Sequence, residues 1–563
     1  MLRFLKKVIF SRSFMTALLI ILQLGFYALI GSVLIEYSTI IQVIAYVLSV
    51  LLAIYILSLK NGSIDVKLPW VIIIILFPVF GSIFYFFFRN QRVRKKVRKN
   101  LEAQAYATKK ISHSPEVIYE ELKIKNKDVH NQSYYIYKNT NMPIYKNTVS
   151  TYFESGEKYF DALVEELNKA QKFIFMEYFI IKQGKMWSTV FNILKEKAKE
   201  GVEVRLLYDD FGCINDLPQS YKKHVEKYGI KCEVFNPIYP ITTLAHNNRD
   251  HRKIVVIDGI VGFTGGINLA DEYINVINRF GHWKDTGIMI KGDAVKSFSL
   301  MFLESWHIYR DEGEDYSPYL PELEIIEQTA PQKKKRFKRK NKKQREKKLK
   351  GKKSFSETID IANIPKATSK FIYKNDWANS EEFIQPYMTT PMEVDEIVGR
   401  NVYVNILNSA KDYVYITTPY LILDPELEEA IINAAKRSVD VRIITPGIPD
   451  KKIVFAVTRS EYTNLLKHGV RIFEYTPGFI HAKNVVSDDT VATIGSINFD
   501  NRSFYHSYEC GIFLYNSDNV EIIRKDFIKC ENLSQEITLK NANKIPLSTR
   551  IKTSLFRLFI PLM

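Results

Sequence analysis

Two short segments of this chain combine a histidine, a lysine and an aspartate at identical spacing. HRKIVVID, residues 251–258, and HAKNVVSD, residues 481–488, both read His-x-Lys-x-x-x-x-Asp. In an extended strand, the His and the Lys of each motif lie on the same face. A lysine neutralises phosphate oxygens, and a histidine beside it can attack phosphorus or transfer a proton. The two segments therefore predict chemistry on a phosphate group.

The repeated spacing indicates an internal duplication. For a chain with ten histidines, composition alone would produce only about 0.1 such matches. A glycine lies seven residues after each aspartate, and an asparagine lies three residues after that glycine. One copy could be an ordinary surface strand, but two copies in repeated halves favour a shared site. The candidate catalytic residues are His251, Lys253, Asp258, His481, Lys483 and Asp488.

The aspartates of the two motifs have the opposite parity to the His and the Lys. Asp258 and Asp488 fall at the end of each strand, before a turn. Because side chains of a strand alternate between faces, these carboxylates point away from the His and Lys side chains. We expect both aspartates to shape the hairpin or to bond to the backbone.

The same order of predicted elements precedes each motif. A buried strand, an amphipathic helix and two further strands follow one another in each half, starting at Lys172, Trp187, Val202 and Tyr228 and again at Asp412, Pro425, Val439 and His468. Strands that alternate with helices are typical of an α/β fold. We predict two duplicated α/β/α halves with mixed sheets, packed around one active site and preceded by transmembrane helices.

The composition divides the chain into five predicted regions. We expect a membrane anchor, a first half, a Lys-rich linker, a second half and a C-terminal tail, at residues 1–100, 101–325, 326–365, 366–545 and 546–563.

The anchor contains three apolar runs. Residues 14–35 and 39–58 are each long enough to cross a bilayer, and the first run lacks the cleavage site of a signal peptide. Pro78 and Gly81 interrupt the third run, and seven basic residues follow within 89–99. Three crossings from a cytoplasmic N-terminus would place the basic cluster outside, against the positive-inside tendency. We therefore favour a re-entrant or broken third segment, a multi-pass protein of the cell membrane, and a cytoplasmic catalytic domain.

The net charge of +17 is concentrated in one segment. Residues 333–353 contain fifteen Lys or Arg and only one acidic residue, Glu346. Such a run is typical of a solvated tether, and it can also attract anionic lipid headgroups. The four cysteines show neither close pairing nor metal-ligand spacing, which predicts free thiols in a reducing compartment, no metal and no cofactor.

Longer strings around the motifs resemble a known family. YDDFG, NNRDHRKIVVIDG, GGINLADEY, HWKDT, TTPYLI, EYTPGFIHAK, VATIGSIN, FDNRSF and YECGIF are similar to bacterial cardiolipin synthases of the phospholipase D superfamily. The resemblance covers the third apolar run and nearly all of residues 140–515. Two features depart from the family pattern, namely Ser438 in place of a glycine and the length of the Lys-rich run.

The resemblance implies a phosphatidyl transfer in two steps. One histidine would attack the phosphorus of phosphatidylglycerol, and the other would protonate the leaving alcohol and then activate the acceptor. The lysines, with Asn268, Asn498 and Ser496, would hold the phosphate oxygens without a metal. A downstream carboxylate would orient each imidazole, Asp285 for His251 and Glu509 for His481.

Other functions remain open at this point. The implied partners are phosphatidylglycerol and anionic membrane lipids, but a hydrolase that releases phosphatidic acid would use the same motifs. A nuclease could use the basic run, although the apolar N-terminus favours lipid over nucleic acid. A membrane scaffold would not need two complete motifs. The attacking histidine, the acyl-chain preference and the oligomeric state are not determined by these patterns.

Overall fold

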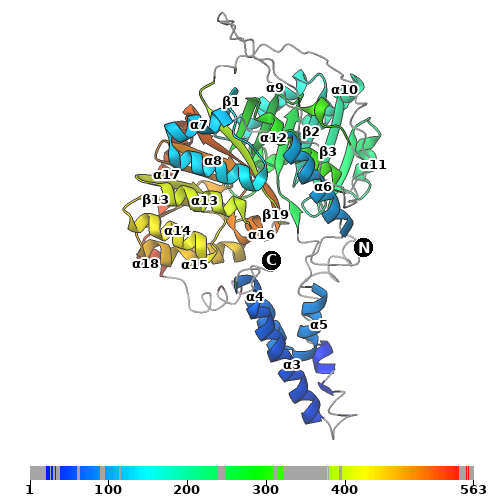
Figure 1. The fold of residues 1–563 in the computed structure, drawn as a ribbon, viewed down its shortest axis with the longest axis vertical. Helices are drawn as coiled ribbons and strands as arrows, with labels where there is room; N and C mark the ends of the chain where they lie inside the picture. The colour runs from blue at the N-terminus through cyan, green and yellow to red at the C-terminus, as the bar shows by residue number, and fades with distance from the viewer. Residues whose placement is uncertain are drawn as a thin grey trace, which may run out of the picture.

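The computed structural model consists of a body of two β-sheets covered by helices and a group of apolar helices at one end of that body (Figure 1). It describes residues 21–25, 27–28, 38–59, 64–88, 95–112, 116–237, 248–308, 314–320, 380–391 and 396–543, with a few single positions besides. The Lys-rich linker, most of the apolar run 14–35 and nearly all of the predicted tail lie outside the described residues.

One helix of the anchor is long enough to cross a membrane. Helix α3, Ser38–Ser58, has 21 residues and extends roughly 30 Å, which matches the hydrocarbon thickness of a bilayer. Within the described residues it is the one helix that combines sufficient length with sufficient apolar character. The second predicted run, 39–58, is therefore confirmed as a helix that could span.

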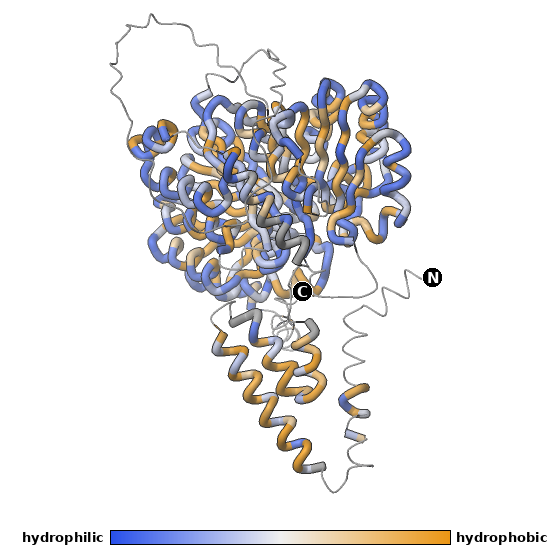
Figure 2. Tube along the Cα trace, turned by 45° about the vertical axis from the view of Figure 1, so that its right-hand side comes forward, coloured by the Kyte–Doolittle hydropathy of each residue, from blue (hydrophilic) through white to orange (hydrophobic). Residues whose placement is uncertain are grey.

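The third apolar run is broken into two short helices. Helices α4 (Ile64–Leu76) and α5 (Pro78–Phe88) meet at Phe77, and a Cβ on Gly81 would lie 2.4 Å from the carbonyl oxygen of Ile73. The two helices therefore fold back closely on each other. Ser49, near the middle of α3, donates a hydrogen bond to the carbonyl of Pro78 at 2.7 Å. The hairpin thus reaches only about half the depth of α3, and this confirms the prediction of a broken segment (Figure 2).

The two sheets of the body repeat one strand order. The first is β1-β9-β7-β6-β2-β3-β4 and the second begins β10-β19-β17-β16-β11-β13-β14 before an added β20. In each sheet three adjacent strands are parallel and the others are antiparallel. The strands are Thr148–Phe153, Gly287–Gly292, Val261–Gly265, Lys253–Ile257, Phe173–Tyr178, Glu203–Asp209, Lys231–Phe235, and then Phe383–Thr389, Ser507–Tyr515, Val491–Gly495, Asn484–Ser487, Tyr413–Thr417, Asp440–Pro446, Arg471–Tyr475 and Ser534–Glu536. The predicted duplication and the mixed α/β fold are both confirmed.

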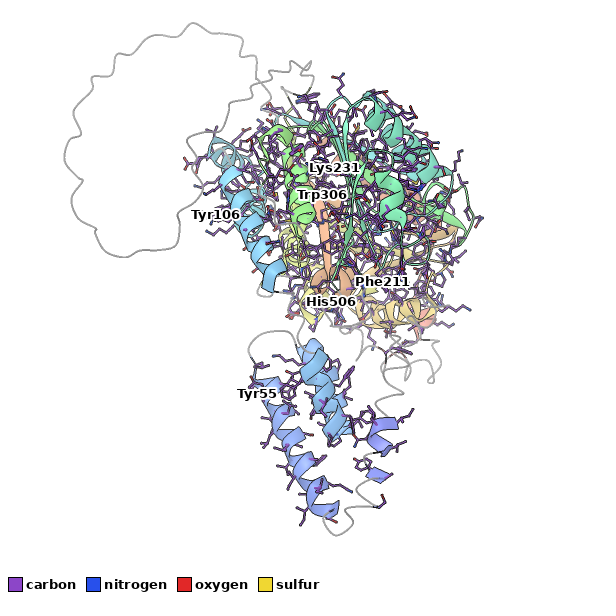
Figure 3. The ribbon with its side chains drawn as sticks, turned by 90° about the vertical axis from the view of Figure 1, so that its right-hand side faces the viewer. Tyr55, Tyr106, Phe211, Lys231, Trp306 and His506 are labelled. Atoms are coloured by element: carbon purple, nitrogen blue, oxygen red, sulfur yellow. The ribbon has the colours of Figure 1, made fainter. Side chains whose placement is uncertain are left out.

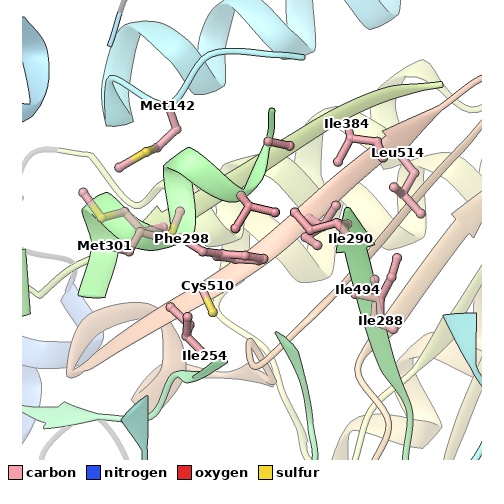
Figure 4. Packing of buried hydrophobic residues seen from close by; sticks show 14 of the residues in the cluster. Met142, Ile254, Ile288, Ile290, Phe298, Met301, Ile384, Ile494, Cys510 and Leu514 are labelled. Atoms are coloured by element: carbon pink, nitrogen blue, oxygen red, sulfur yellow. The ribbon is translucent and has the colours of Figure 1, made fainter. Parts of the chain in front are cut away.

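Helices cover the outer faces of the sheets, and two helices, α12 (Val295–His307) and α17 (Asp518–Asn532), fill the space between the two halves. The covering helices are α9 (Gly156–Lys169), α10 (Lys185–Lys199), α11 (Tyr221–Glu226), α13 (Val398–Ser409), α14 (Pro425–Lys436) and α15 (Lys452–Lys467). Helix α12 is buried at every residue except Lys296. Its Phe298 and Met301 pack in one core with side chains from both sheets, among them Ile254, Ile290, Ile384 and Leu514 (Figure 4). The two halves therefore share a core.

A helical hairpin near the start of the first half packs against the second half. Helices α7 (Glu116–Lys125) and α8 (Lys127–Thr140) follow α6 (Lys95–Ile111). Their apolar residues Leu122, Val129 and Ile136 belong to the core of the second half, and Gln385 donates to the carbonyl of Ser133 at 3.1 Å. The predicted first half, 101–325, therefore includes a segment that belongs in space to the second half. Sequence order alone assigned it to the nearer repeat.

The serine that departs from the family pattern lies in a helix-to-strand turn. Ser438 connects α14 to β13 with a φ of 68°, and the matching turn after α10 contains Gly201 at 89°. A left-handed backbone favours glycine. This location confirms the turn that was predicted for Ser438.

Candidate active site

The segments that carry the two histidines are exchanged between the halves. Strand β5, Arg249–Asp250, pairs in parallel with the start of β19 in the second sheet. Strand β15, Gly478–Ile480, pairs in parallel with β8, His282–Lys284, from the first half. The register of the first pair places His251 beside Glu509. The register of the second pair places His481 beside Asp285.

Each histidine is therefore bonded to a carboxylate from the other half. His251 Nδ1 lies 2.9 and 3.0 Å from the carboxylate oxygens of Glu509, and His481 Nδ1 lies 2.7 Å from Asp285 Oδ2. The predicted pairing of Asp285 with His251 and Glu509 with His481 is wrong. Each carboxylate does follow the histidine of its own half along the chain, but the strand exchange brings it to the other histidine. Neither half alone holds a complete His–carboxylate pair.

Both motif lysines are buried beside the histidines of their own motifs. Lys253 Nζ donates to the carbonyl of His251 at 2.5 Å, and Lys483 Nζ donates to the carbonyl of His481. Burial lowers the pKa of Lys253 to about 8. Burial and the neighbouring Lys253 lower the pKa of Lys483 to about 7 against the attraction of Asp285. A bound phosphate would favour the ammonium form of both lysines.

Burial favours the neutral form of both imidazoles. Burial, followed by the nearby lysines, lowers the pKa of His251 well below its usual range and that of His481 to about 4. Each Nδ1 proton is donated to a carboxylate, which leaves Nε2 with its lone pair. Among the described residues, neither Nε2 has a hydrogen-bond partner. Burial also raises the pKa of Glu509 to about 7, against the attraction of Lys253.

The motif aspartates hold the backbone at the far end of the strand. Asp258 accepts hydrogen bonds from the amides of residues 171–173 at 2.7 to 2.9 Å. Asp488 accepts from the amides of residues 411–413 at 2.8 to 3.0 Å. Both have a left-handed backbone, with φ of 54° and 55°. The predicted backbone role is confirmed. Asp258 and Asp488, which the motif included among the candidate catalytic residues, therefore support the fold of each motif and do not belong to the reacting groups.

The predicted phosphate-binding residues lie close to the histidine pairs. Asn268 accepts from the amide of Ile180 at 3.0 Å and donates to Tyr273 at 2.7 Å, so its amide group is largely used within the protein. Asn498 is buried, and its Oδ1 has no hydrogen-bond partner in the described part of the chain. Ser496 donates to Glu509 at 2.5 Å, which makes it a support for the carboxylate. A phosphate contact by any of the three remains a prediction.

Several neighbours of the site were not predicted. Phe179 lies edge-on to His251 at 4.9 Å, whereas Tyr273, Trp283 and Phe479 surround His481 at 5.5, 5.5 and 5.7 Å. Behind the first motif, the buried Arg252 is bonded to Glu177 at 2.8 Å and to Asp250 at 3.1 Å. The strings GGINLADEY, HWKDT and EYTPGFIHAK contained Tyr273, Trp283 and Phe479, but no spacing rule pointed to an aromatic wall.

Within the described ranges, no group of three or more His, Cys, Asp or Glu side chains could hold a metal ion, and all four cysteines are free and buried. The arrangement offers two neutral imidazoles and two lysines, which suits covalent transfer of a phosphoryl group.

Comparison with known proteins first defines the class. The family described as "Cardiolipin synthase, PLD-like domain" matches twice, at residues 163–296 and 403–530, and "Phospholipase_D-nuclease N-terminal" matches residues 47–90. The crystal structure of a phosphatidylserine synthase from Haemophilus influenzae covers 77% of this chain and 98% of its own, with a TM-score of 0.51 and 12% identity. The fold is that of the phospholipase D superfamily.

The relatives in sequence narrow the assignment. A cardiolipin synthase of Alkalihalophilus pseudofirmus is 30% identical over 92% of this chain and 93% of its own length. A cardiolipin synthase 2 of Bacillus anthracis is 31% identical over 90% of this chain and 89% of its own. The chain belongs to the bacterial cardiolipin synthase family. It is a membrane-associated phosphatidyltransferase that acts on phospholipids.

Proposed function

We propose that this enzyme joins two phosphatidylglycerol molecules into cardiolipin and releases glycerol. The Nε2 atom of one histidine attacks the phosphorus of the first lipid and breaks its bond to the glycerol oxygen. The negative charge of the bound phosphate diester favours the imidazolium form of the other histidine, whose Nε2 donates the proton that the leaving glycerol needs. That histidine then takes a proton from a hydroxyl of the second lipid, whose oxygen attacks phosphorus and frees the first imidazole.

The crossed pair of imidazoles supports this mechanism most directly. Each Nδ1 is bonded to a buried carboxylate, so each ring is oriented with Nε2 available. The carboxylate stabilises the imidazolium that forms when its ring accepts a proton. Lys253 and Lys483 supply positive charge where the phosphorane oxygens become more negative.

The decisive experiment supplies purified protein with phosphatidylglycerol alone. Cardiolipin and glycerol should appear in equal amounts, without nucleotide or added metal. Because one phosphodiester replaces another, labelled glycerol added with cardiolipin should enter phosphatidylglycerol. Steady release of phosphatidic acid without labelled lipid would identify a hydrolase and refute the proposal.

We also propose that the body lies on the cytoplasmic side of the cell membrane, as part of a multi-pass protein. The α4–α5 hairpin leads the chain back to the end of α3 from which it started, and seven basic residues follow within 89–99. Basic residues favour the cytoplasmic side. A Val117→Cys variant, exposed on α7, should react with an impermeant thiol reagent in inverted vesicles only. Labelling in intact cells would contradict this orientation.

A further inference from the structure

Four exposed aliphatic side chains lie on two loops near the active site. Val276 and Ile277 follow the short helix η3 (Asp271–Ile274), and Ile448 and Ile453 flank the start of α15. Their exposed fractions are 48%, 45%, 40% and 53%. Single exposed aliphatic residues are common, but a group drawn from two loops marks an interaction surface. We call these four residues the apolar rim.

The two loops of the apolar rim meet where the halves exchange strands. The amide of Ile448 donates to the carbonyl of Gly478 in β15 at 3.2 Å. Gly281, which precedes β8, has a φ of 73°, and a Cβ at this position would lie 3.1 Å from Ile448 Cδ1. The same Cβ would lie 2.4 Å from the carbonyl oxygen of Pro477, so glycine is needed for this close approach. Ile448 therefore lies at the joint between the two halves, beside the loop that leads into β8.

An aromatic wall connects this joint to His481. Phe280 lies 6.1 Å from Phe479, Phe479 lies 4.8 Å from Trp283, and Trp283 lies 4.7 Å from Tyr273. Three of these rings surround the imidazole. Tyr273, Trp283 and Phe479 are buried, so the aromatic wall is a continuous apolar contact between this joint and the imidazole.

Basic side chains flank the rim. Arg279, Lys451 and Lys452 are exposed in the same two loops. The Arg279 guanidinium lies 5.0 Å above the ring of Phe280, and Lys451 Nζ lies 5.4 Å from the ring of Tyr420. Exposed cations beside aliphatic residues are suited to an interface between anionic headgroups and acyl chains.

This surface faces the apolar helices of the anchor. Helix α15 lies at the end of the body nearest α4, whereas α7 lies at the opposite end (Figure 1). Phe211, which follows β3, and His506, whose carbonyl accepts from Arg249 at 3.1 Å, also lie at the end toward the anchor (Figure 3). The active site and the membrane helices are therefore on the same side of the body.

We propose that the apolar rim rests on the surface of an anionic bilayer and admits phospholipid along the aromatic wall to His481. This inference depends on the proposed function, because it assigns the substrate a route from the bilayer. Charge complementarity and the position of α3 favour a lipid surface over a second copy of the chain.

The test compares one lipid in two physical states. Activity of the full chain is measured on monomeric dihexanoyl phosphatidylglycerol and on long-chain phosphatidylglycerol vesicles that contain the reconstituted enzyme. The double variant Ile448→Ser/Ile453→Ser should lose at least about tenfold of the vesicle rate and keep the monomer rate. The control Val117→Ser/Ile124→Ser removes two aliphatic residues of α7 that are 77% and 85% exposed, and it should change neither rate.

Two outcomes would overturn the inference. An equal loss on both substrates would assign the rim to folding or to chemistry, and an unchanged vesicle rate would remove its role in docking. If the wild-type protein makes no cardiolipin from either substrate, the proposed function fails. Docking of the rim must then be tested by its physical contact with the lipid surface, independently of activity.

A fluorescence measurement provides that contact test. The four native cysteines are buried, so an Ile453→Cys variant can be labelled selectively. Lipids with a nitroxide near the headgroup should quench the Ile453→Cys label more strongly than a label on Val117→Cys, and more in phosphatidylglycerol than in phosphatidylcholine. Equal quenching at both positions would refute docking. A label that responds only to protein concentration would assign the rim to a second copy of the chain.

Discussion

Replacing Lys483 by methionine should stabilise the fold at pH 6 while it abolishes activity. Burial and Lys253 lower the pKa of Lys483 from the usual 10.5 to about 7, a shift that corresponds to about 5 kcal/mol. Methionine has a similar length and no charge, so it avoids most of this cost. Loss of the hydrogen bond to the carbonyl of His481 destabilises the variant by about 1–2 kcal/mol. The expected net gain is about 3 kcal/mol.

The gain should shrink as the pH rises. Because the pKa of Lys483 is lower in the folded state, the unfolded chain binds more protons between pH 7 and 10.5, and wild-type stability increases over that range. The advantage of Lys483→Met should narrow by about 3 kcal/mol between pH 7 and pH 9. For a body of several hundred residues, this corresponds to about 3 °C in Tm. Thermal unfolding of the full chain in detergent at pH 6 and pH 9 measures it.

An exposed lysine provides the control. Lys199 on α10 is 66% exposed, and Lys199→Met should leave the stability nearly unchanged at both pH values. If Lys483→Met unfolds at a lower temperature than wild type at pH 6, or if the difference does not depend on pH, the desolvated lysine is not a source of instability.

Three further predictions follow from the site and the fold. His251→Ala and His481→Ala should each reduce cardiolipin formation below about a hundredth of the wild-type rate, since acid–base help alone supplies 10²–10⁴-fold; a higher residual rate in either variant would contradict a shared mechanism. Ser438→Gly should raise the free energy of unfolding by about 1 kcal/mol because glycine relieves the strain of a left-handed backbone, and Gly201→Ser should lower it. Chemical denaturation measures both free energies, and a change of the same sign in the two variants would contradict the role of backbone strain. A chelator should leave the initial rate unchanged, and a metal bound stoichiometrically to active enzyme, measured by elemental analysis, would refute this.

The duplicated architecture could be predicted because it depends on local patterns. The His-x-Lys spacing, the alternation of strands and helices, and the repeated Gly and Asn after each motif all recur along the chain. Strand parity also separated the aspartates from the lysines, and the hydrogen bonds of Asp258 and Asp488 agree with it.

The crossed histidine pairs could not be predicted in this way. They depend on β5 and β15 adding to strands of the opposite half, in a register set by contacts between residues about 200 to 260 positions apart. The resemblance was applied to each repeat as if it were complete, so it assigned Asp285 to His251, the motif histidine of its own half. The α7–α8 hairpin was misplaced for the same reason, because its apolar face packs against a core that lies far along the chain.

The central claim is that His251 works with Glu509 and His481 with Asp285, and adduct trapping tests it directly. The substrate is a phosphatidyl ester of p-nitrophenol, whose leaving group needs no proton. Loss of the acid–base histidine should then permit a covalent phosphatidyl-enzyme, whereas loss of the nucleophile should not. Whichever histidine attacks, Glu509→Gln should group with His251→Ala, and Asp285→Asn should group with His481→Ala. The opposite grouping, with Asp285→Asn behaving like His251→Ala, would contradict the crossed active site.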